Sequence, residues 1–153
     1  MPPPVAFGPM VHIAQHIDID ALLEAVWGAA SDLAAHHRWM ADAESVVFLS
    51  ETRSGVGTVM QVRTVVGPFR TTDVMEVIEW DEGRAIGVRH EGLVTGTGRF
   101  TLSAMANGTR FSWTEDLSFP TWLGGPVTAI LAKPVLGLIW RRNLRGLKKH
   151  LEE

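Results

Sequence analysis

The sequence predicts an α+β domain in which helices cover one face of an antiparallel sheet. First, the spacing of apolar residues changes from a period of about 3.6 to about 2 after roughly residue 40, which indicates helices followed by strands. Second, short turns join the successive candidate strands, as in an antiparallel meander. Third, residues 136–151 carry a long apolar stripe at helical spacing. The predicted elements are one strand, two short helices, six strands and a long helix, an order that is typical of an α+β domain.

The chain before residue 40 is predicted to hold one strand and two short helices. Apolar residues alternate along residues 11–17, which is typical of a strand. Asp20 is a suitable N-cap for a helix over residues 21–30, and Asp32 for a second helix that ends near Trp39. The start is rich in proline, so we expect residues 1–9 to form a disordered or extended tail and residues 10–153 to form a single domain.

Six strands are predicted in the middle of the chain, each bounded by turn residues. Their limits are residues 45–51, 58–66, 69–80, 85–91, 95–104 and 109–117. Gly67-Pro68 and Asn107-Gly108 mark two of the turns, and Asn-Gly is a strong hairpin signal. In residues 69–80 the inward phase is ambiguous: the inner set is either Thr71, Asp73, Met75 and Val77 or Thr72, Val74, Glu76 and Ile78.

The C-terminal segment allows two interpretations, a membrane span or a helix packed on the sheet. Residues 123–140 carry a single charge, Lys133, and are nearly long enough to cross a bilayer. Because Lys133 and Pro134 lie at the centre of this run, we expect no integral membrane insertion, and a kink or break at the proline. The buried stripe is predicted to be Leu136, Trp140, Leu144, Leu147 and Leu151, with Val127 and Leu131 pointing nearly the opposite way.

Composition argues against several classes of function. The 153 residues carry a net charge of −3 with a pI of about 6.1, which argues against nucleic-acid binding. The chain has no cysteine and no tyrosine, which excludes a thiolate metal site, a cysteine nucleophile and a phenolic acid. Phosphate-loop, serine-triad and metal-cluster motifs are absent from the sequence, so we expect no cofactor and no metal. Without a signal peptide, the chain is expected to be cytoplasmic.

Short motifs along the chain make it similar to a known family. In order they are Val26-Trp27, Ser31-Asp32-Leu33, Arg38-Trp39-Met40 with Val46, Gly55-Val56-Gly57, Glu76-Val77, Gly108-Thr109-Arg110, Asn143-Leu144-Arg145 with Leu147, and Leu151-Glu152. Through their order and spacing the sequence resembles the polyketide cyclase/dehydrase group of the START-like (SRPBCC) superfamily, from about residue 11 to residue 152. One departure is Glu79-Trp80-Asp81-Glu82-Gly83, where the family usually has a proline before the next strand.

The resemblance implies the helix-grip fold, in which a seven-stranded antiparallel sheet curves around the C-terminal helix. It also implies a cavity between sheet and helix that opens near the two short helices and holds a hydrophobic or aromatic ligand. Gly96 and Gly98 are expected to leave room beside this cavity. The residues expected to contact the ligand are Trp39, Met40, Met60, Asp73, Met75, Val88, Phe100, Phe111, Trp113, Leu131 and Val135.

Alternation along the strands points two ionisable side chains into this space. His90 is in phase with the apolar residues of strand 85–91, and Glu115 with those of strand 109–117. Burial raises the pKa of a carboxyl and lowers that of a histidine, unless the two groups pair. Such a pair is able to move protons to and from an enolisable polyketide, so His90 and Glu115 are the candidate catalytic residues, with Asp73 as a weaker third. The alternative is a satisfied polar pair without a catalytic role.

Three functions remain open at the level of sequence. The first is binding of a lipid-like or polyketide-like molecule in the cavity. The second is a polyketide cyclase, aromatase or dehydratase that works in the same cavity, so enzymatic activity is undecided. The third is a regulatory or interaction module whose cavity is filled by side chains such as Met60 and Phe100. A hydrophobic small molecule is the expected partner, and a homodimer is left open.

Overall fold

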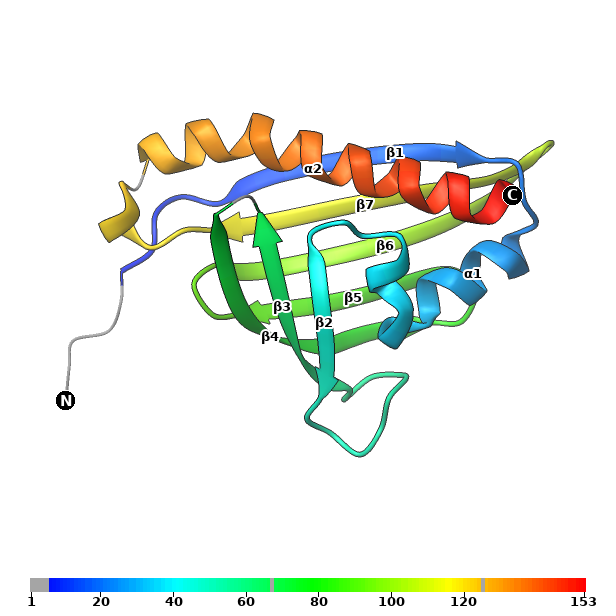
Figure 1. Ribbon diagram of the computed structural model, residues 1–153, viewed down its shortest axis with the longest axis horizontal. Helices are drawn as coiled ribbons and strands as arrows, with labels where there is room; N and C mark the ends of the chain where they lie inside the picture. The colour runs from blue at the N-terminus through cyan, green and yellow to red at the C-terminus, as the bar shows by residue number, and fades with distance from the viewer. Residues whose placement is uncertain (1–5, 67, 125) are drawn as a thin grey trace.

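One curved antiparallel sheet wraps around the longest helix of the chain (Figure 1). The computed structural model describes residues 6–66, 68–124 and 126–153. The elements are β1 (Val11–Ile19), α1 (Leu23–Ser31), the 3₁₀ helix η1 (Leu33–Arg38), β2 (Ala43–Phe48), β3 (Val59–Val66), β4 (Phe69–Asp81), β5 (Ala85–Glu91), β6 (Thr95–Met105), β7 (Gly108–Ser118), the 3₁₀ helix η2 (Thr121–Leu123) and α2 (Pro126–Glu152). The predicted α+β class and element order are confirmed.

The sheet has seven strands in the order β1-β7-β6-β5-β4-β3-β2, and all neighbours are antiparallel. Strands β2 to β7 form the predicted meander, whereas β1 pairs with β7 at the far edge. The two edge strands, β1 and β2, therefore lie on either side of α2, and the concave face between them is covered by α1, η1 and α2 (Figure 1). This arrangement places an interior space between the sheet and α2.

Of the two predicted aspartate caps, Asp20 is wrong, whereas Asp32 is found at the N-cap position of the second short helix. Strand β1 continues to Ile19, so the chain needs the next three residues to turn, and α1 begins at Leu23 with Leu22 as its N-cap. The backbone amide of Asp20 instead lies 3.4 Å from a carboxylate oxygen of Glu152. Asp32 precedes η1 without a side-chain cap hydrogen bond. The two short helices exist as predicted: α1 begins two residues later than expected, and the second begins at Leu33, directly after Asp32.

Helix α2 runs without interruption through Pro134, so of the kink or break expected there, the break does not occur. A proline removes one hydrogen bond of the helix, and Pro134 lies on an exposed part of α2, where water is able to replace it. The stripe predicted to face the sheet is confirmed for its central residues, because Trp140, Leu144 and Leu147 are buried. The stripe also includes Leu136 and Leu151, which are partly buried against the same core.

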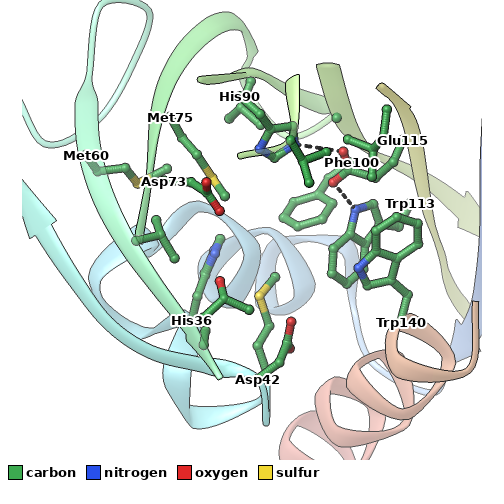
Figure 2. A pocket seen from close by; sticks show the side chains of 18 of the residues that line it. His36, Asp42, Met60, Asp73, Met75, His90, Phe100, Trp113, Glu115 and Trp140 are labelled. Atoms are coloured by element: carbon green, nitrogen blue, oxygen red, sulfur yellow. Dashed lines mark hydrogen bonds and ion pairs between the residues drawn. The ribbon is translucent and has the colours of Figure 1, made fainter. Parts of the chain in front are cut away.

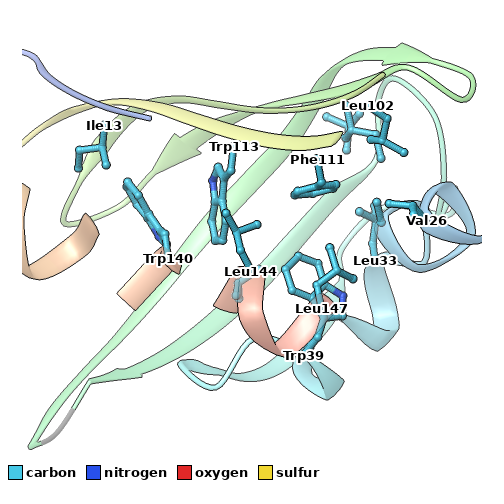
Figure 3. Close-up of a cluster of buried hydrophobic side chains, with 14 of the residues drawn as sticks. Ile13, Val26, Leu33, Trp39, Leu102, Phe111, Trp113, Trp140, Leu144 and Leu147 are labelled. Carbon is cyan, nitrogen blue, oxygen red and sulfur yellow. The ribbon is translucent and has the colours of Figure 1, made fainter. Parts of the chain in front are cut away.

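The core lies between the concave face of the sheet and the three helices (Figure 3). Asn143, buried on α2, joins the helix to the segment after η1: its amide oxygen accepts from the backbone amide of Ala41 at 3.1 Å, and its nitrogen donates to Asp42 at 2.6 Å. One turn later, Gly146 lies against the carbonyl of Trp39. These contacts hold η1 and α2 together at one end of the interior space.

The N-terminal segment before β1 is partly tied to the end of β7. Phe7 forms an isolated antiparallel bridge with Pro120, and the amide of Gly8 donates to the carbonyl of Phe119 at 2.8 Å. For residues 1–5, the predicted tail lies outside the described residues, as does Gly67 of the predicted turn. None of the described helices is long and apolar enough to cross a membrane.

Candidate ligand-binding cavity

A cavity of about 270 Å³ lies between the concave face of the sheet, η1 and α2 (Figure 2). Its wall is mostly apolar. The lining side chains are Leu33, His36, Met40, Asp42, Ala43, Val46, Met60, Val62, Thr64, Thr71, Asp73, Met75, Ile86, Val88, His90, Val94, Arg99, Phe100, Trp113, Glu115, Leu117, Phe119, Leu136 and Trp140, together with Gly98.

Most of the predicted ligand residues lie on this wall. They are Met40, Met60, Asp73, Met75, Val88, Phe100 and Trp113. For β4 the first of the two phases is the observed one, because Thr71, Asp73 and Met75 line the cavity, whereas Ile78 is exposed beside a bulge in the pairing with β5. The inward set of β4 is therefore Thr71, Asp73 and Met75, followed by the buried Val77.

Four of the predicted ligand residues lie away from the lining. Trp39 and Phe111 are buried in the core beside it, where their rings are 6.2 Å apart and both contact Phe100. Leu131 and Val135 are exposed on α2. Because α2 is continuous, these two residues stay on the side of the helix opposite to the buried stripe, whereas a break at Pro134 would have allowed them to turn inward.

The two candidate catalytic residues meet inside the cavity. His90 Nε2 lies 2.7 Å from Glu115 Oε2, and the two side chains are only 12% and 6% exposed. The other carboxylate oxygen of Glu115 accepts a hydrogen bond from Trp113 Nε1 at 2.9 Å, as Figure 2 shows. His90 Nδ1 makes no hydrogen bond within the described part of the chain. The pair therefore leaves one ring nitrogen for a ligand.

Glycine on the intervening strand allows this contact. His90 is on β5 and Glu115 is on β7, with β6 between them, so their backbones are about 10 Å apart. At the crossing point β6 has Gly98, which pairs with Glu115 in the register of the sheet. A Cβ atom at Gly98 would lie 2.5–2.6 Å from the Glu115 carboxylate. The room expected at Gly98 is therefore the space in which the pair forms.

The pair determines the charge of His90. Burial alone would lower the pKa of His90, but the hydrogen bond and negative charge of Glu115, together with the charge of Asp73, outweigh burial and raise this pKa above its ordinary value. Beside Glu115 the imidazolium form of His90 is therefore favoured more strongly than it is for a free histidine. The sequence left open whether His90 and Glu115 are buried separately or pair with each other, and in the structure they pair.

Asp73 and His36 add polar atoms elsewhere on the wall. Burial raises the pKa of Asp73, and the Leu93 amide, Thr71 and the charge of His90 only partly oppose this. Among the described residues, Asp73 Oδ1 has no hydrogen-bond partner. Burial lowers the pKa of His36, although the Ala30 carbonyl, 2.7 Å from Nε2, favours its charged form. His36 is therefore a neutral group.

Several lining residues, on strands as well as on helices, were not predicted. Among the helical ones, His36 was not singled out as a ligand contact, and Leu136 and Trp140 were expected only to pack α2 against the sheet. Helical spacing identifies the inward face of such segments, but it does not distinguish a contact with side chains from a contact with empty space. In the described ranges, no group of three or more histidine, aspartate or glutamate side chains is arranged to hold a metal ion.

Comparisons with known proteins agree with this architecture. Residues 10–152 match the model of a family described as polyketide cyclase / dehydrase and lipid transport. A search of curated proteins found no significant match. Three similar solved structures are the TTHA0849 protein of Thermus thermophilus (21% identity, 94% of this chain and 97% of that chain, TM-score 0.78), a START superfamily protein of Mycobacterium smegmatis (14%, 93% and 97%, 0.79) and the ZhuI aromatase/cyclase of a Streptomyces species (18%, 94% and 94%, 0.70). The fold is thus the helix grip.

Proposed function

The chain belongs to the polyketide cyclase / dehydrase and lipid transport family, and on this basis we propose that it binds a small hydrophobic or aromatic molecule between the sheet and α2. The observation that carries the proposal is the cavity of about 270 Å³ with a largely apolar wall and one buried charged pair. Pockets for small molecules combine an apolar lining with a few polar groups that orient the ligand.

The volume limits the size of the ligand. An apolar cavity of about 150 Å³ holds benzene, so a cavity of about 270 Å³ has room for about two fused rings. This volume is slightly below the usual range for ligand pockets, which is about 300–1,000 Å³. An open space of this size argues against a module whose interior is filled by its own side chains. The Nδ1 atom of His90, which Glu115 does not contact, favours a ligand with a hydroxyl or carbonyl oxygen facing it.

Calorimetric titration with 1-naphthol tests this proposal. In a Val88→Trp variant the indole fills part of the cavity, so binding should be lost. Val56→Trp is the matched control, because Val56 is exposed far from the cavity lining, and it should bind as the unmodified chain does. Native mass spectrometry of the purified protein gives an independent readout of retained ligand. Equal binding of 1-naphthol by both variants would place the site elsewhere.

Proton transfer is a second candidate function, favoured by the His90–Glu115 pair. An imidazolium at His90 is able to donate from Nδ1 to a carbonyl oxygen while Glu115 holds the ring in place. Such a group makes the α-proton of the ketone more acidic while a base from the solvent takes that proton, which gives the enol. Enolisation is a step that cyclisation and dehydration of polyketides share.

The exchange of α-hydrogens for deuterium in 2-tetralone, a two-ring enolisable ketone, tests proton transfer by NMR. We expect the chain to accelerate exchange and His90→Phe to slow it by about 10² or more. The variant Glu115→Gln should also slow exchange, because it removes the charge that keeps His90 protonated. Exchange at the buffer rate in the unmodified chain, or at its full rate in both variants, would reject catalysis while leaving the binding proposal intact.

A further inference from the structure

The outer face of α2 carries an apolar stripe with no part of the described chain covering it. Its members are Val127, Ile130, Leu131, Val135 and Leu138, and Trp122 of η2 lies just before them. These side chains are 52–73% exposed. Their spacing of three or four residues places the helical members on one side of α2. The opposite side holds Leu136 and Trp140, which line the cavity.

The same outer face becomes basic toward the C-terminus. Arg141, Arg142, Arg145 and Lys149 continue the line of the stripe at helical spacing, and all four are exposed. None of them forms an ion pair within the described ranges. From residue 126 to residue 151 the helix has no carboxylate, although the whole chain has a net charge of −3. The positive charge is thus concentrated beside the apolar stripe.

We propose that this face of α2 is a docking surface for an anionic lipid bilayer. An amphipathic helix of this kind lies in the plane of the membrane interface, with its aliphatic and aromatic side chains at the boundary of the acyl chains. Lysine and arginine beside it attract anionic phospholipids. The apolar stripe supplies the side chains that contact the acyl chains, and the four cations attract the anionic phospholipids. Together they cover about 33 Å of helix from residue 127 to residue 149.

The charge on α2 favours a bilayer over a second copy of the chain as the partner of this face. In a symmetric contact the facing helix would be another α2, which has no carboxylate before Glu152. The four cations would then meet only Glu152 at the end of that helix, a carboxylate that already pairs with Lys148. Phosphate groups of an anionic membrane supply counter-charge across the whole face, and the bilayer covers the exposed stripe at the same time.

Vesicle flotation tests the proposal with the full chain. We expect little binding to vesicles of phosphatidylcholine alone and clear binding when about a third of the lipid is phosphatidylglycerol, with screening by salt. The double variant Leu131→Glu/Val135→Glu should reduce the bound fraction by about tenfold or more. The variant Arg141→Gln/Arg145→Gln should remove most of the preference for anionic lipid. Both changes lie on exposed positions, and circular dichroism checks that the helices are retained.

The matched control is Leu49→Glu/Val56→Glu, which places the same two charges at exposed apolar positions outside α2; its binding should equal that of the unmodified chain. Three results would overturn the proposal: no flotation with anionic vesicles, equal flotation of the Leu131→Glu/Val135→Glu variant, or concentration-dependent self-association that this variant abolishes in a chain that does not float. The last result would assign the stripe to a second copy.

Discussion

Replacing Gly98 by alanine should separate the buried pair of the cavity. The added Cβ would lie 2.5–2.6 Å from the Glu115 carboxylate, so the carboxylate must retreat by about 0.9 Å to reach an ordinary contact. The His90–Glu115 distance of 2.7 Å would then exceed the length of a hydrogen bond. Because hydrogen bonds to charged groups contribute about 1.5–3 kcal/mol, the free energy of unfolding should fall by about that amount at pH 6.

The sign of the pH dependence distinguishes this explanation from simple crowding. The pKa of His90 is raised in the folded chain, so the pair stabilises fully below the unfolded value of about 6.5 and this contribution is lost as pH rises through the folded pKa. In Gly98→Ala the imidazole stays buried without its partner, and its pKa should drop below 6.5. The stability difference between the two proteins should therefore be larger at pH 6 than at pH 9.

Urea unfolding at both pH values gives the free energies, and an NMR titration of the His90 ring gives its pKa directly. Gly28→Ala is the matched control, because a Cβ at Gly28 meets no atom within 4 Å, and it should leave the pKa of His90 unchanged. If His90 titrates in Gly98→Ala as it does in the unmodified chain, the pair does not depend on the space at Gly98 and this reasoning is refuted.

Three further predictions concern the contacts of α2, each measured by urea unfolding. Asn143→Ala leaves the Ala41 amide, now bonded at 3.1 Å, without its acceptor and should cost about 1–3 kcal/mol; an unchanged midpoint would contradict this. Gly146→Ala should cost about 1–3 kcal/mol, since its Cβ would lie 2.6 Å from the Trp39 carbonyl oxygen; Gly28→Ala is again the control. Pro134→Ala should stabilise by up to about 3 kcal/mol, because α2 is already helical there; a loss of stability would show that the proline is needed.

The strands could be predicted because each one shows alternating apolar residues and is bounded by turn residues. Alternation in β5 and β7 is enough to point His90 and Glu115 to the same face. The short turns predicted the meander, and the family resemblance implied a seven-stranded sheet curved around the C-terminal helix. The sequence did not show that the two residues meet, since this depends on three strands and on the missing side chain of Gly98.

The helices were less predictable for a physical reason. A proline within a helical pattern predicts a break from local energetics, but the packing of Trp140 and Leu144 on the sheet holds the segment after Pro134 in the same helix. Leu131 and Val135 were expected to contact ligand, and they are exposed instead. Their position on the outer face follows once α2 is known to be continuous.

Trp113 gives the cavity an intrinsic optical reporter. Its indole donates to Glu115 at 2.9 Å and lies 5.2 Å from the ring of Trp140 on α2. Two indoles at this distance couple their electronic transitions, and a protonated imidazole nearby quenches indole emission. The near-ultraviolet dichroism and fluorescence of the chain should therefore record the titration of His90 and the arrival of a ligand between sheet and helix, without an added dye.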